Sequence, residues 1–295
     1  MDMWNKGFEG WYYKHQLGAD AVAFIPGRAK SGSFVQMIST EGSRYFAVPE
    51  LWVEKGVIHG GNCLFSSRGC RIDLPGVSGE IFYGKLTALN SDIMGPFRFL
   101  PMECRHGVIS MYHKLKGSLV IDGKRHSFDG GIGYIEKDSG KSFPSSYQWL
   151  QCNDFGEPCS LMVSIANIPF CGGNFTGCIC SIIYGGREYR LATYKGVRIL
   201  AADENHIRLF QGKLLLELEI TPLCPGKSLY APVKGQMTGI IRESVSAGIR
   251  ARLWDRSRQV FDLRSSYAAY EFAPSVAGHQ RDILEDKGLK QSFIL

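Results

Sequence analysis

Apolar and polar residues alternate along most of the chain in short runs that end at Gly, Asn, Ser or Pro. Residues 21–26 and 33–39 are examples. Alternation of this kind predicts half-buried β-strands, and the dipeptide Asp122-Gly123 predicts a tight hairpin between two of them. Helical periodicity is nearly absent before residue 270. The chain is therefore expected to be all-β, with one short helical tail at residues 280–290.

A weak repeat relates the two halves of the chain. Motifs of the first half recur in the same order about 140 residues later. The matched pairs are the aromatic cluster from Phe8 with that from Phe143, residues 21–26 with 163–169, residues 33–38 with 178–183, and Phe128-Asp129 before Tyr134-Ile135-Glu136 with Phe261-Asp262 before Tyr270-Glu271.

The repeat predicts two β-domains, residues 1–140 and 141–273, followed by a tail at residues 274–295. About eight strands per half suit an antiparallel β-barrel that is closed or nearly closed, because closure removes exposed strand edges. A barrel of that size can hold one small apolar ligand.

The bulk composition narrows the class of protein. Of the 295 residues, 44% are hydrophobic, yet no apolar run is long enough to span a bilayer. The net charge of +6 is spread along the chain without a basic block, so no nucleic-acid partner is expected. No leader pattern opens the chain, and a cytoplasmic location is expected. Nine cysteines without a Cys-x-x-Cys pair predict reduced, mostly buried thiols and no structural zinc.

Glu9 is the first candidate for chemistry. In a strand, Glu9, Trp11 and Tyr13 share one face. If that face is the barrel interior, a carboxyl group lies beside two aromatic rings, and burial there raises its pKa and suits it to proton donation. The alternative is a glutamate at the rim that pairs with Lys14 or with an arginine.

Glu136 and Asp138 are the second candidates. They lie two residues apart, so an extended chain puts both carboxyl groups on one face. Neighbouring carboxylates push each other's pKa values apart, which gives one acid and one anion. Arg242 could hold one of them through two hydrogen bonds. The alternatives are a solvated linker for the acidic pair and a surface strand for Arg242 and Glu243.

Three amide side chains form a third group. Gln148, Gln151 and Asn153 flank Trp149 in an otherwise apolar strand. Buried amides need partners, which are either each other or the oxygens of a ligand. Motifs for a serine nucleophile or for paired histidine metal ligands are absent, so no catalytic metal is expected.

Taken together, these motifs resemble those of the tocopherol cyclase family. The resemblance extends over residues 7–272, and the block from Tyr134 to Pro144 is its most specific part. Ser139 and Tyr147 depart from it, because the family commonly has Trp at both positions. The matching segments are residues 8–12, 24–27, 34–36, 133–138, 140–144, 149–153 and, more weakly, Gly235-Gln236-Met237 through Arg242-Glu243. The first of them is shared with a wider group of lipocalin-like proteins that includes carotenoid hydratases.

The resemblance implies two lipocalin-like β-barrels and an acid-promoted ring closure of a prenylated quinol to a chromanol, without a cofactor. Plant members carry an N-terminal extension, whereas this chain begins at the motif and resembles a bacterial-type relative. The two departures imply a smaller or more polar ligand. The residues suited to proton transfer are Glu136, Asp138 and Glu9, and those suited to substrate binding are Trp11, Tyr13, Trp149, Gln151, Asn153, Lys141, Met237, Arg242 and Glu243.

Three alternatives remain open at this point. Water admitted to the same carbocation would make the protein an isoprenoid hydratase. A cavity without a buried acid would make it a non-catalytic carrier of an apolar small molecule. Barrels filled by side chains would indicate a structural or interaction protein. Because isoprenoid substrates reside in membranes, peripheral contact of an apolar rim with a membrane is also expected for the first two.

Overall fold

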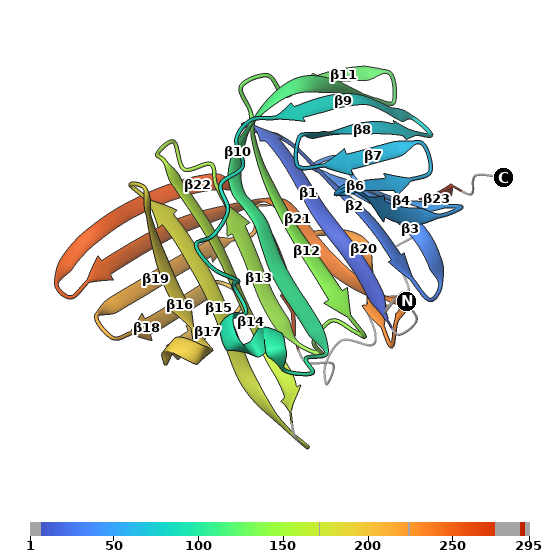
Figure 1. Cartoon of the computed structure of the whole chain (residues 1–295). Helices are drawn as coiled ribbons and strands as arrows, with labels where there is room; N and C mark the ends of the chain where they lie inside the picture. The colour runs from blue at the N-terminus through green and yellow to red at the C-terminus, as the bar shows by residue number, and fades with distance from the viewer. Residues whose placement is uncertain (1–6, 171, 224, 275–289, 293–295) are drawn as a thin grey trace.

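The computed structural model describes residues 7–170, 172–223, 225–274 and 290–292. Over these residues it is built almost entirely from strands, which form two large sheets (Figure 1). Two short 3-10 segments, η1 (Gly95–Phe99) and η2 (Thr193–Lys195), interrupt the strands. Among the described residues, no helical segment has the length and hydrophobicity that a bilayer crossing needs. The all-β prediction is confirmed.

The first sheet contains the strands up to Gly140, together with one short strand from the C-terminal end of the chain. Its long strand β10 bends, pairing with β12 through its first part and with β9 and β11 through its second. Its strands are β1 (Phe8–Leu17), β2 (Asp20–Ala29), β3 (Gly32–Ser39), β4 (Ser43–Val48), β5 (Leu51–Glu54), β6 (Val57–Gly60), β7 (Cys63–Ser66), β8 (Gly69–Leu74), β9 (Val77–Tyr83), β10 (Cys104–Ile121), β11 (Lys124–Ser127), β12 (Ile132–Gly140) and β23 (Lys290–Ser292).

The second sheet begins at Tyr147 and repeats this plan. Its long strand β21 likewise pairs with β20 through its first part and with β19 through its second, while β22 runs beside it. Its strands are β13 (Tyr147–Cys152), β14 (Cys159–Phe170), β15 (Gly173–Tyr184), β16 (Arg187–Ala192), β17 (Arg198–Ala202), β18 (His206–Gln211), β19 (Leu214–Thr221), β20 (Lys227–Val233), β21 (Gln236–Asp255) and β22 (Arg258–Ala273).

Neither sheet closes on itself. The hydrogen-bonded order runs from β23 to β5 in the first sheet and from β16 to β17 in the second, and both orders are open paths. Of the closed or nearly closed barrels expected from strand number, full closure is therefore not reached, because strand number alone does not fix how far a sheet curls. The helix expected at residues 280–290 lies mostly outside the described residues, and residue 290 belongs to β23, which pairs with β4 in parallel.

Apolar side chains form a core inside the curl of each sheet and a third core between the sheets. Phe24, Phe65 and Ile81 belong to the first core, and Leu161, Leu191 and Leu253 to the second. The third core joins Tyr12 and Tyr134 of the first sheet to Trp149 and Met162 of the second. Strands β1 and β12, in the middle of Figure 1, therefore contribute side chains to a core on each of their faces. The division into two domains stays a prediction.

A packing prediction follows from Gly133 in β12. A Cβ atom at Gly133 would lie 2.2 Å from Nε2 of His113, whose side chain is buried and whose Nδ1 lies 3.0 Å from Oγ of Ser110. Because this imidazole has no room to move, Gly133→Ala is expected to lower the free energy of unfolding in urea by about 1–3 kcal/mol.

The matched control for this prediction is Gly107→Ala on the neighbouring strand β10. There the nearest atom to an added Cβ is the carbonyl oxygen of Lys137 at 3.8 Å, which is an ordinary contact. Gly133→Ala creates a clash with His113, whereas Gly107→Ala creates no clash. Equal stabilities of the two variants would contradict the packing argument.

Candidate functional site

A cavity lies between the two sheets. Its empty space measures about 1250 Å³, which includes open solvent at its mouth, and most of its wall is apolar. Phe8 and Tyr12 on β1 and Phe34 on β3 line it from the first sheet. Trp149 on β13 and Ile179 on β15 line it from the second. A concave, largely apolar space with a few polar groups is the usual form of a small-molecule site.

Glu136 is the central polar residue of the first-sheet wall. In β12, Tyr134, Glu136 and Asp138 alternate with Ile135 and Lys137, so the first three project to the same side of the sheet. The Glu136 side chain is buried, and its Oε2 accepts hydrogen bonds from Tyr134 Oη at 2.6 Å and from Trp149 Nε1 at 3.3 Å. Donors from both sheets therefore converge on one carboxyl oxygen.

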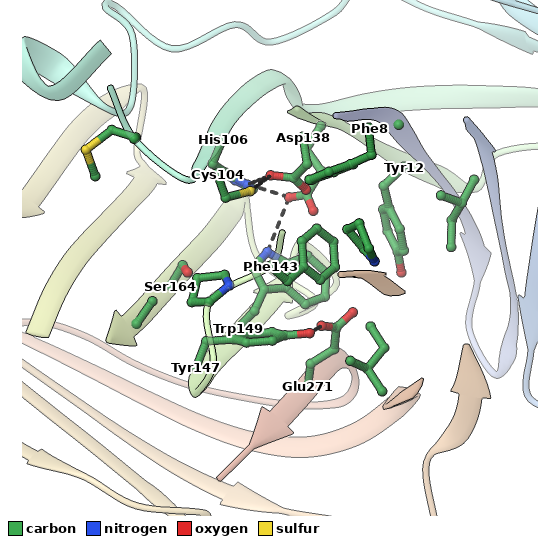
Figure 2. A pocket seen from close by; sticks show the side chains of 18 of the residues that line it. Phe8, Tyr12, Cys104, His106, Asp138, Phe143, Tyr147, Trp149, Ser164 and Glu271 are labelled. Atoms are coloured by element: carbon green, nitrogen blue, oxygen red, sulfur yellow. Dashed lines mark hydrogen bonds and ion pairs between the residues drawn. The ribbon is translucent and has the colours of Figure 1, made fainter. Parts of the chain in front are cut away.

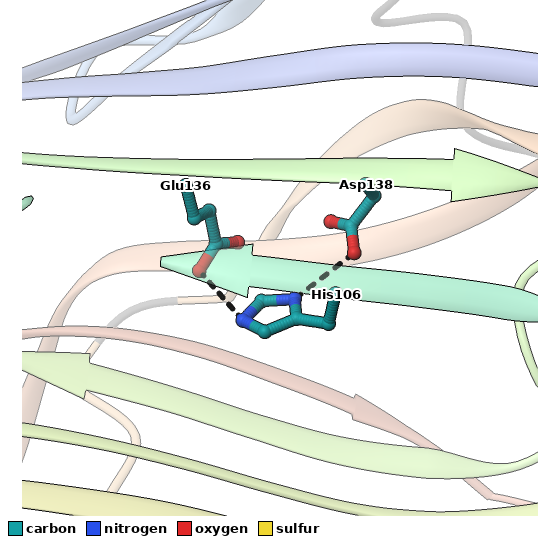
Figure 3. Close-up of side chains that lie close together, drawn as sticks. All are labelled: His106, Glu136 and Asp138. Carbon is teal, nitrogen blue, oxygen red and sulfur yellow. Dashed lines mark hydrogen bonds and ion pairs between the residues drawn. The ribbon is translucent and has the colours of Figure 1, made fainter. Parts of the chain in front are cut away.

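His106 joins Glu136 to Asp138. It lies directly opposite Asp138 in the pairing of β10 with β12. Its Nδ1 is 2.9 Å from Oδ1 of Asp138, and its Nε2 is 3.4 Å from Oε2 of Glu136 (Figure 3). Burial by itself lowers the pKa of His106, but the Glu136 and Asp138 carboxylates outweigh it and raise that pKa to about 9. His106 is thus a cation at neutral pH.

Burial raises the pKa of Glu136 to about 7. The charge of His106 and the hydrogen bond from Tyr134 oppose this shift, while the charge of Asp138 adds to it. Because burial is the largest cause, a good part of the Glu136 population carries a proton at neutral pH. When the proton leaves, the two hydrogen-bond donors and the imidazolium stabilise the carboxylate.

The second-sheet wall contains another pair of carboxyl groups. Glu243 on β21 and Glu271 on β22 are directly opposite each other in the strand register, and Trp149 on β13 is the next residue in the same row. Tyr12 donates a hydrogen bond to Oε1 of Glu243, and Tyr147 donates one to Oε2 of Glu271 at 2.5 Å. The Glu243 side chain is fully buried, whereas Glu271 is partly exposed.

Both members of this pair favour the neutral form. Burial and then the Glu271 carboxylate raise the pKa of Glu243 well above its usual range. Burial raises the pKa of Glu271 to about 8, although the hydrogen bond from Tyr147 lowers it. Two adjacent carboxyl groups away from water cannot both ionise without a large penalty. The pair therefore presents a protonated carboxyl group at neutral pH.

Aromatic rings fill the wall between the two polar groups (Figure 2). The ring of Phe143 makes edge contacts with Phe8 at 5.4 Å and with Tyr147 at 5.9 Å. The ring of Tyr12 contacts that of Trp149 at 5.5 Å. Such surfaces bind apolar groups and stabilise a positive charge that develops over their faces.

The His106, Glu136 and Asp138 side chains could also act as metal ligands. One donor atom of each lies within 4.8 Å of the others. A divalent cation would require His106 in its neutral form, whereas the two carboxylates hold it protonated. The expectation of no metal stays a prediction, and the arrangement is described below as an imidazolium between two carboxyl groups.

Glu9 lies away from the cavity. It forms ion pairs with Arg28 at 2.8 Å and with Lys137 at 2.5 Å. Lys137 in turn lies over the ring of Trp11 at 4.7 Å. This is the rim arrangement that the sequence left as the alternative, so Glu9 is not placed where a ligand in the cavity could receive its proton.

Tyr13 is also outside the cavity wall. Its ring packs in the first-sheet core, 5.2 Å from Phe65 and 6.4 Å from Tyr83. Trp11 belongs to the same core but also reaches the cavity. The cavity wall formed by β1 thus consists of Phe8, Gly10 and Tyr12 from the opposite face and Trp11 from the Glu9 face, and a role of Glu9 or Tyr13 in the chemistry stays a prediction.

The amide side chains on β13, and that of Asn153 just after it, hold protein segments together. Gln151 accepts a hydrogen bond from the buried Lys14 amino group at 3.1 Å. Nδ2 of Asn153 donates to the carbonyl oxygens of Gly133 and Met111 in the first sheet. Protein groups take these hydrogen bonds, whereas Gln148 Oε1 and Gln151 Nε2 are buried without a partner among the described residues, so the binding role of these amides stays a prediction.

The remaining predicted residues divide between the cavity and the surface. Met237 and Glu243 line the cavity, together with Trp149, Glu136 and Asp138. Lys141 and Arg242 are exposed and lie outside its wall. Arg242 alternates with Glu243 along β21, which turns it away from the cavity, and His106 takes the place expected for it between Glu136 and Asp138.

Sequence reasoning missed His106 and Glu271, and also the three tyrosines that donate hydrogen bonds to the carboxyl groups, Tyr12, Tyr134 and Tyr147. The repeat offered a signal for Glu271, since it pairs this residue with Glu136. No motif marks His106, because its role depends on the register of β10 against β12. Of the two departures from the family pattern, Tyr147 lines the cavity, whereas Ser139 lies on the Glu9 face outside it.

Comparison with known sequences places residues 77–273 within the model of the family described as tocopherol cyclase-like. A rice protein (Oryza sativa subsp. japonica) described as "Probable tocopherol cyclase, chloroplastic" is 24% identical over 213 residues. That match covers 64% of this chain and 44% of the rice protein, so the chain spans less than half of its relative's length.

Two crystal structures are similar in fold. CghA superposes with a TM-score of 0.63 at 10% identity, over 93% of this chain and 90% of that one. Kievitone hydratase from Nectria haematococca gives 0.54 at 11% identity, over 91% and 89%. At such low identity these matches show the shared, lipocalin-like fold alone.

Proposed function

The chain belongs to the tocopherol cyclase-like family, and we propose that it closes a prenylated quinol to a chromanol by acid catalysis without a cofactor. The observation that carries the proposal is the buried carboxyl group of Glu136, with a pKa raised to about 7, in the wall of a largely apolar cavity. A general acid works best when its pKa lies near the working pH.

Each turnover would begin with Glu136 protonated. Its proton adds to the less substituted carbon of the prenyl double bond, and positive charge develops on the tertiary carbon. The phenolic oxygen attacks that carbon and forms the ring C–O bond. The phenolic proton then returns to the Glu136 carboxylate, so product and substrate are isomers and no oxidant or reductant is consumed.

The surrounding residues have defined tasks in this scheme. Tyr134, Trp149 and His106 stabilise the Glu136 carboxylate while its proton is on the substrate. Asp138 fixes His106 as an imidazolium. The rings of Trp149 and Tyr12 lie near this carboxyl group and would stabilise the developing cation, while the apolar wall excludes water.

The test is to incubate the protein with a panel of prenylated quinols in heavy water and to analyse the products by mass spectrometry and NMR. The Glu136 carboxyl group exchanges its proton for deuterium. We expect a chromanol with one deuterium on the carbon next to the new C–O bond, because that carbon receives the proton.

Other results of this experiment would replace the proposal. A product heavier by one water molecule would make the protein a hydratase. Unchanged quinol that stays bound to the protein would make it a carrier. A chromanol without deuterium at that carbon would rule out proton addition as the first step. The cytoplasmic location and the membrane contact of the cavity rim stay predictions.

A further inference from the structure

The Glu243–Glu271 pair has no task in the scheme above, yet it occupies part of the same cavity wall. Both residues line the cavity. Their strands place them opposite each other, where two like charges would repel. The charge of the buried Lys14 acts on Glu243, but the hydrogen bonds of its amino group go to Gln151 and to the Tyr267 carbonyl oxygen instead. A buried acidic pair of this kind calls for an explanation.

The hydrogen bonds of the pair are incomplete. Tyr12 donates to Oε1 of Glu243. A hydrogen bond links the Glu243 and Glu271 carboxyl groups, raising the pKa of Glu243 and lowering that of Glu271, and Oε2 of Glu243 takes no hydrogen bond from any other described residue. Tyr147 donates to Oε2 of Glu271. A carboxyl pair that shares a proton and has few other hydrogen bonds, next to a cavity, is a group whose hydrogen bonding a ligand can complete.

We propose that the Glu271 carboxyl group, with Glu243 behind it, binds an oxygen of the ligand's aromatic ring, either a hydroxyl or a carbonyl group. Glu271 touches the ligand, and Glu243 is a positioning residue that keeps a proton on the pair. The inference rests on the proposed function, since it concerns the same cavity, and it assigns the quinol head group to the second-sheet wall.

A neutral oxygen fits this subsite better than an ion does. The pair carries a proton, so it can donate a hydrogen bond to a ligand oxygen without placing a net charge in the apolar wall. An anion would meet two acidic groups, and a cation would require both of them to ionise. The nearby rings of Phe143 and Tyr147 offer edge and face contacts to an aromatic head group.

Several titratable groups surround Glu271, and its protonation depends on all of them. The hydrogen bond from Tyr147 favours the carboxylate, whereas the charges of Glu136 and Asp138 favour the neutral form. The titratable groups that line the same cavity are Glu243 on β21, Tyr147 on β13, Glu136 and Asp138 on β12, Tyr12 on β1 and His106 on β10, and the charge of Lys14 on β1 acts on Glu243.

The test compares two ligands that cannot react. One is a quinol with a saturated isoprenoid tail, and the other is the same alkylbenzene without its two hydroxyl groups. Binding is followed by quenching of tryptophan fluorescence, since Trp11 and Trp149 line the cavity. We expect the wild-type protein to bind the quinol about tenfold more tightly at about pH 6.5, the usual effect of one good hydrogen bond.

Two variants separate the role of Glu271 from a general effect on structure. Glu271→Leu should bind both ligands about equally, because the donor is gone. Glu271→Gln should keep the preference at every pH, since its amide still donates and does not titrate. In the wild type, the Glu271 carboxyl group donates below about pH 8, and above it the carboxylate accepts from the quinol hydroxyl, so the preference should persist across that pH.

The outcomes distinguish this inference from the proposed function. Equal binding of the two ligands by the wild type, or a preference that survives in Glu271→Leu, would overturn the subsite. If an unsaturated quinol is cyclised all the same, the proposed function stands without it. A clear preference for the quinol without any turnover would support the subsite and remove the catalytic proposal.

Discussion

Glu136→Gln is expected to lower kcat for quinol cyclisation by about a hundredfold to ten-thousandfold, the usual contribution of a general acid. Glutamine keeps the size of the side chain and an oxygen that accepts the hydrogen bonds from Tyr134 and Trp149. It has no acidic proton to donate. The non-reacting quinol should therefore bind to this variant nearly as tightly as to the wild type, so that the loss falls on kcat.

The pH dependence of the wild type checks the same assignment. Glu136 must be protonated to act, so kcat should fall as pH rises through about 7, the raised pKa of this group. Glu9→Gln is the matched control, since it removes a carboxyl group that is paired with Arg28 and Lys137 outside the cavity. A Glu9→Gln variant that loses as much activity as Glu136→Gln would refute the choice of acid.

Glu243→Gln is expected to stabilise the protein at alkaline pH. Burial raises the pKa of Glu243 far above its value in the unfolded chain, so the folded protein holds a proton that the unfolded chain releases. The stability that this proton contributes is complete below the unfolded pKa and is lost as pH rises towards the folded one. Glutamine does not titrate, and its variant escapes this loss.

The direction of the effect follows from the linkage between protons and folding. As pH rises above the unfolded pKa, the free energy of unfolding of Glu243→Gln should rise relative to wild type by about 1.4 kcal/mol for each pH unit until the folded pKa is reached. Urea denaturation at several pH values measures this difference. Glu54→Gln, at an exposed position, serves as the control and should show a flat difference. A flat difference for Glu243→Gln as well would mean that this carboxyl group ionises freely in the folded protein.

The local alternation of apolar and polar residues predicted the strands. It also predicted which side chains of a strand share a face, and thereby part of the site. The alternation in β12 predicted that Glu136 and Asp138 share a face, and both line the cavity. The repeat aligned Glu271 with Glu136, but no role for Glu271 was inferred from that alignment. The alternation depends only on residues close together in one strand, and the repeat depends on short motifs that recur along the chain, which is why the sequence shows both.

The same alternation could not say which face of β1 meets the ligand. Glu9, Trp11 and Tyr13 on one face and Phe8, Gly10 and Tyr12 on the other are all compatible with burial, since β1 has a core on each side. A strand buried on both faces has no polar side to mark its orientation. The packing of the second sheet decided the matter.

By itself, the sequence determined the all-β class, the family and the strand that presents Glu136 and Asp138, because strand periodicity and local motifs are written in neighbouring residues. Only the tertiary structure decided that the sheets stay open and that the cavity lies between them. It also decided that His106 lies opposite Asp138 and that Glu243 lies opposite Glu271. Those contacts join distant segments through strand register and sheet packing, which determine the burial that raises the pKa of each carboxyl group.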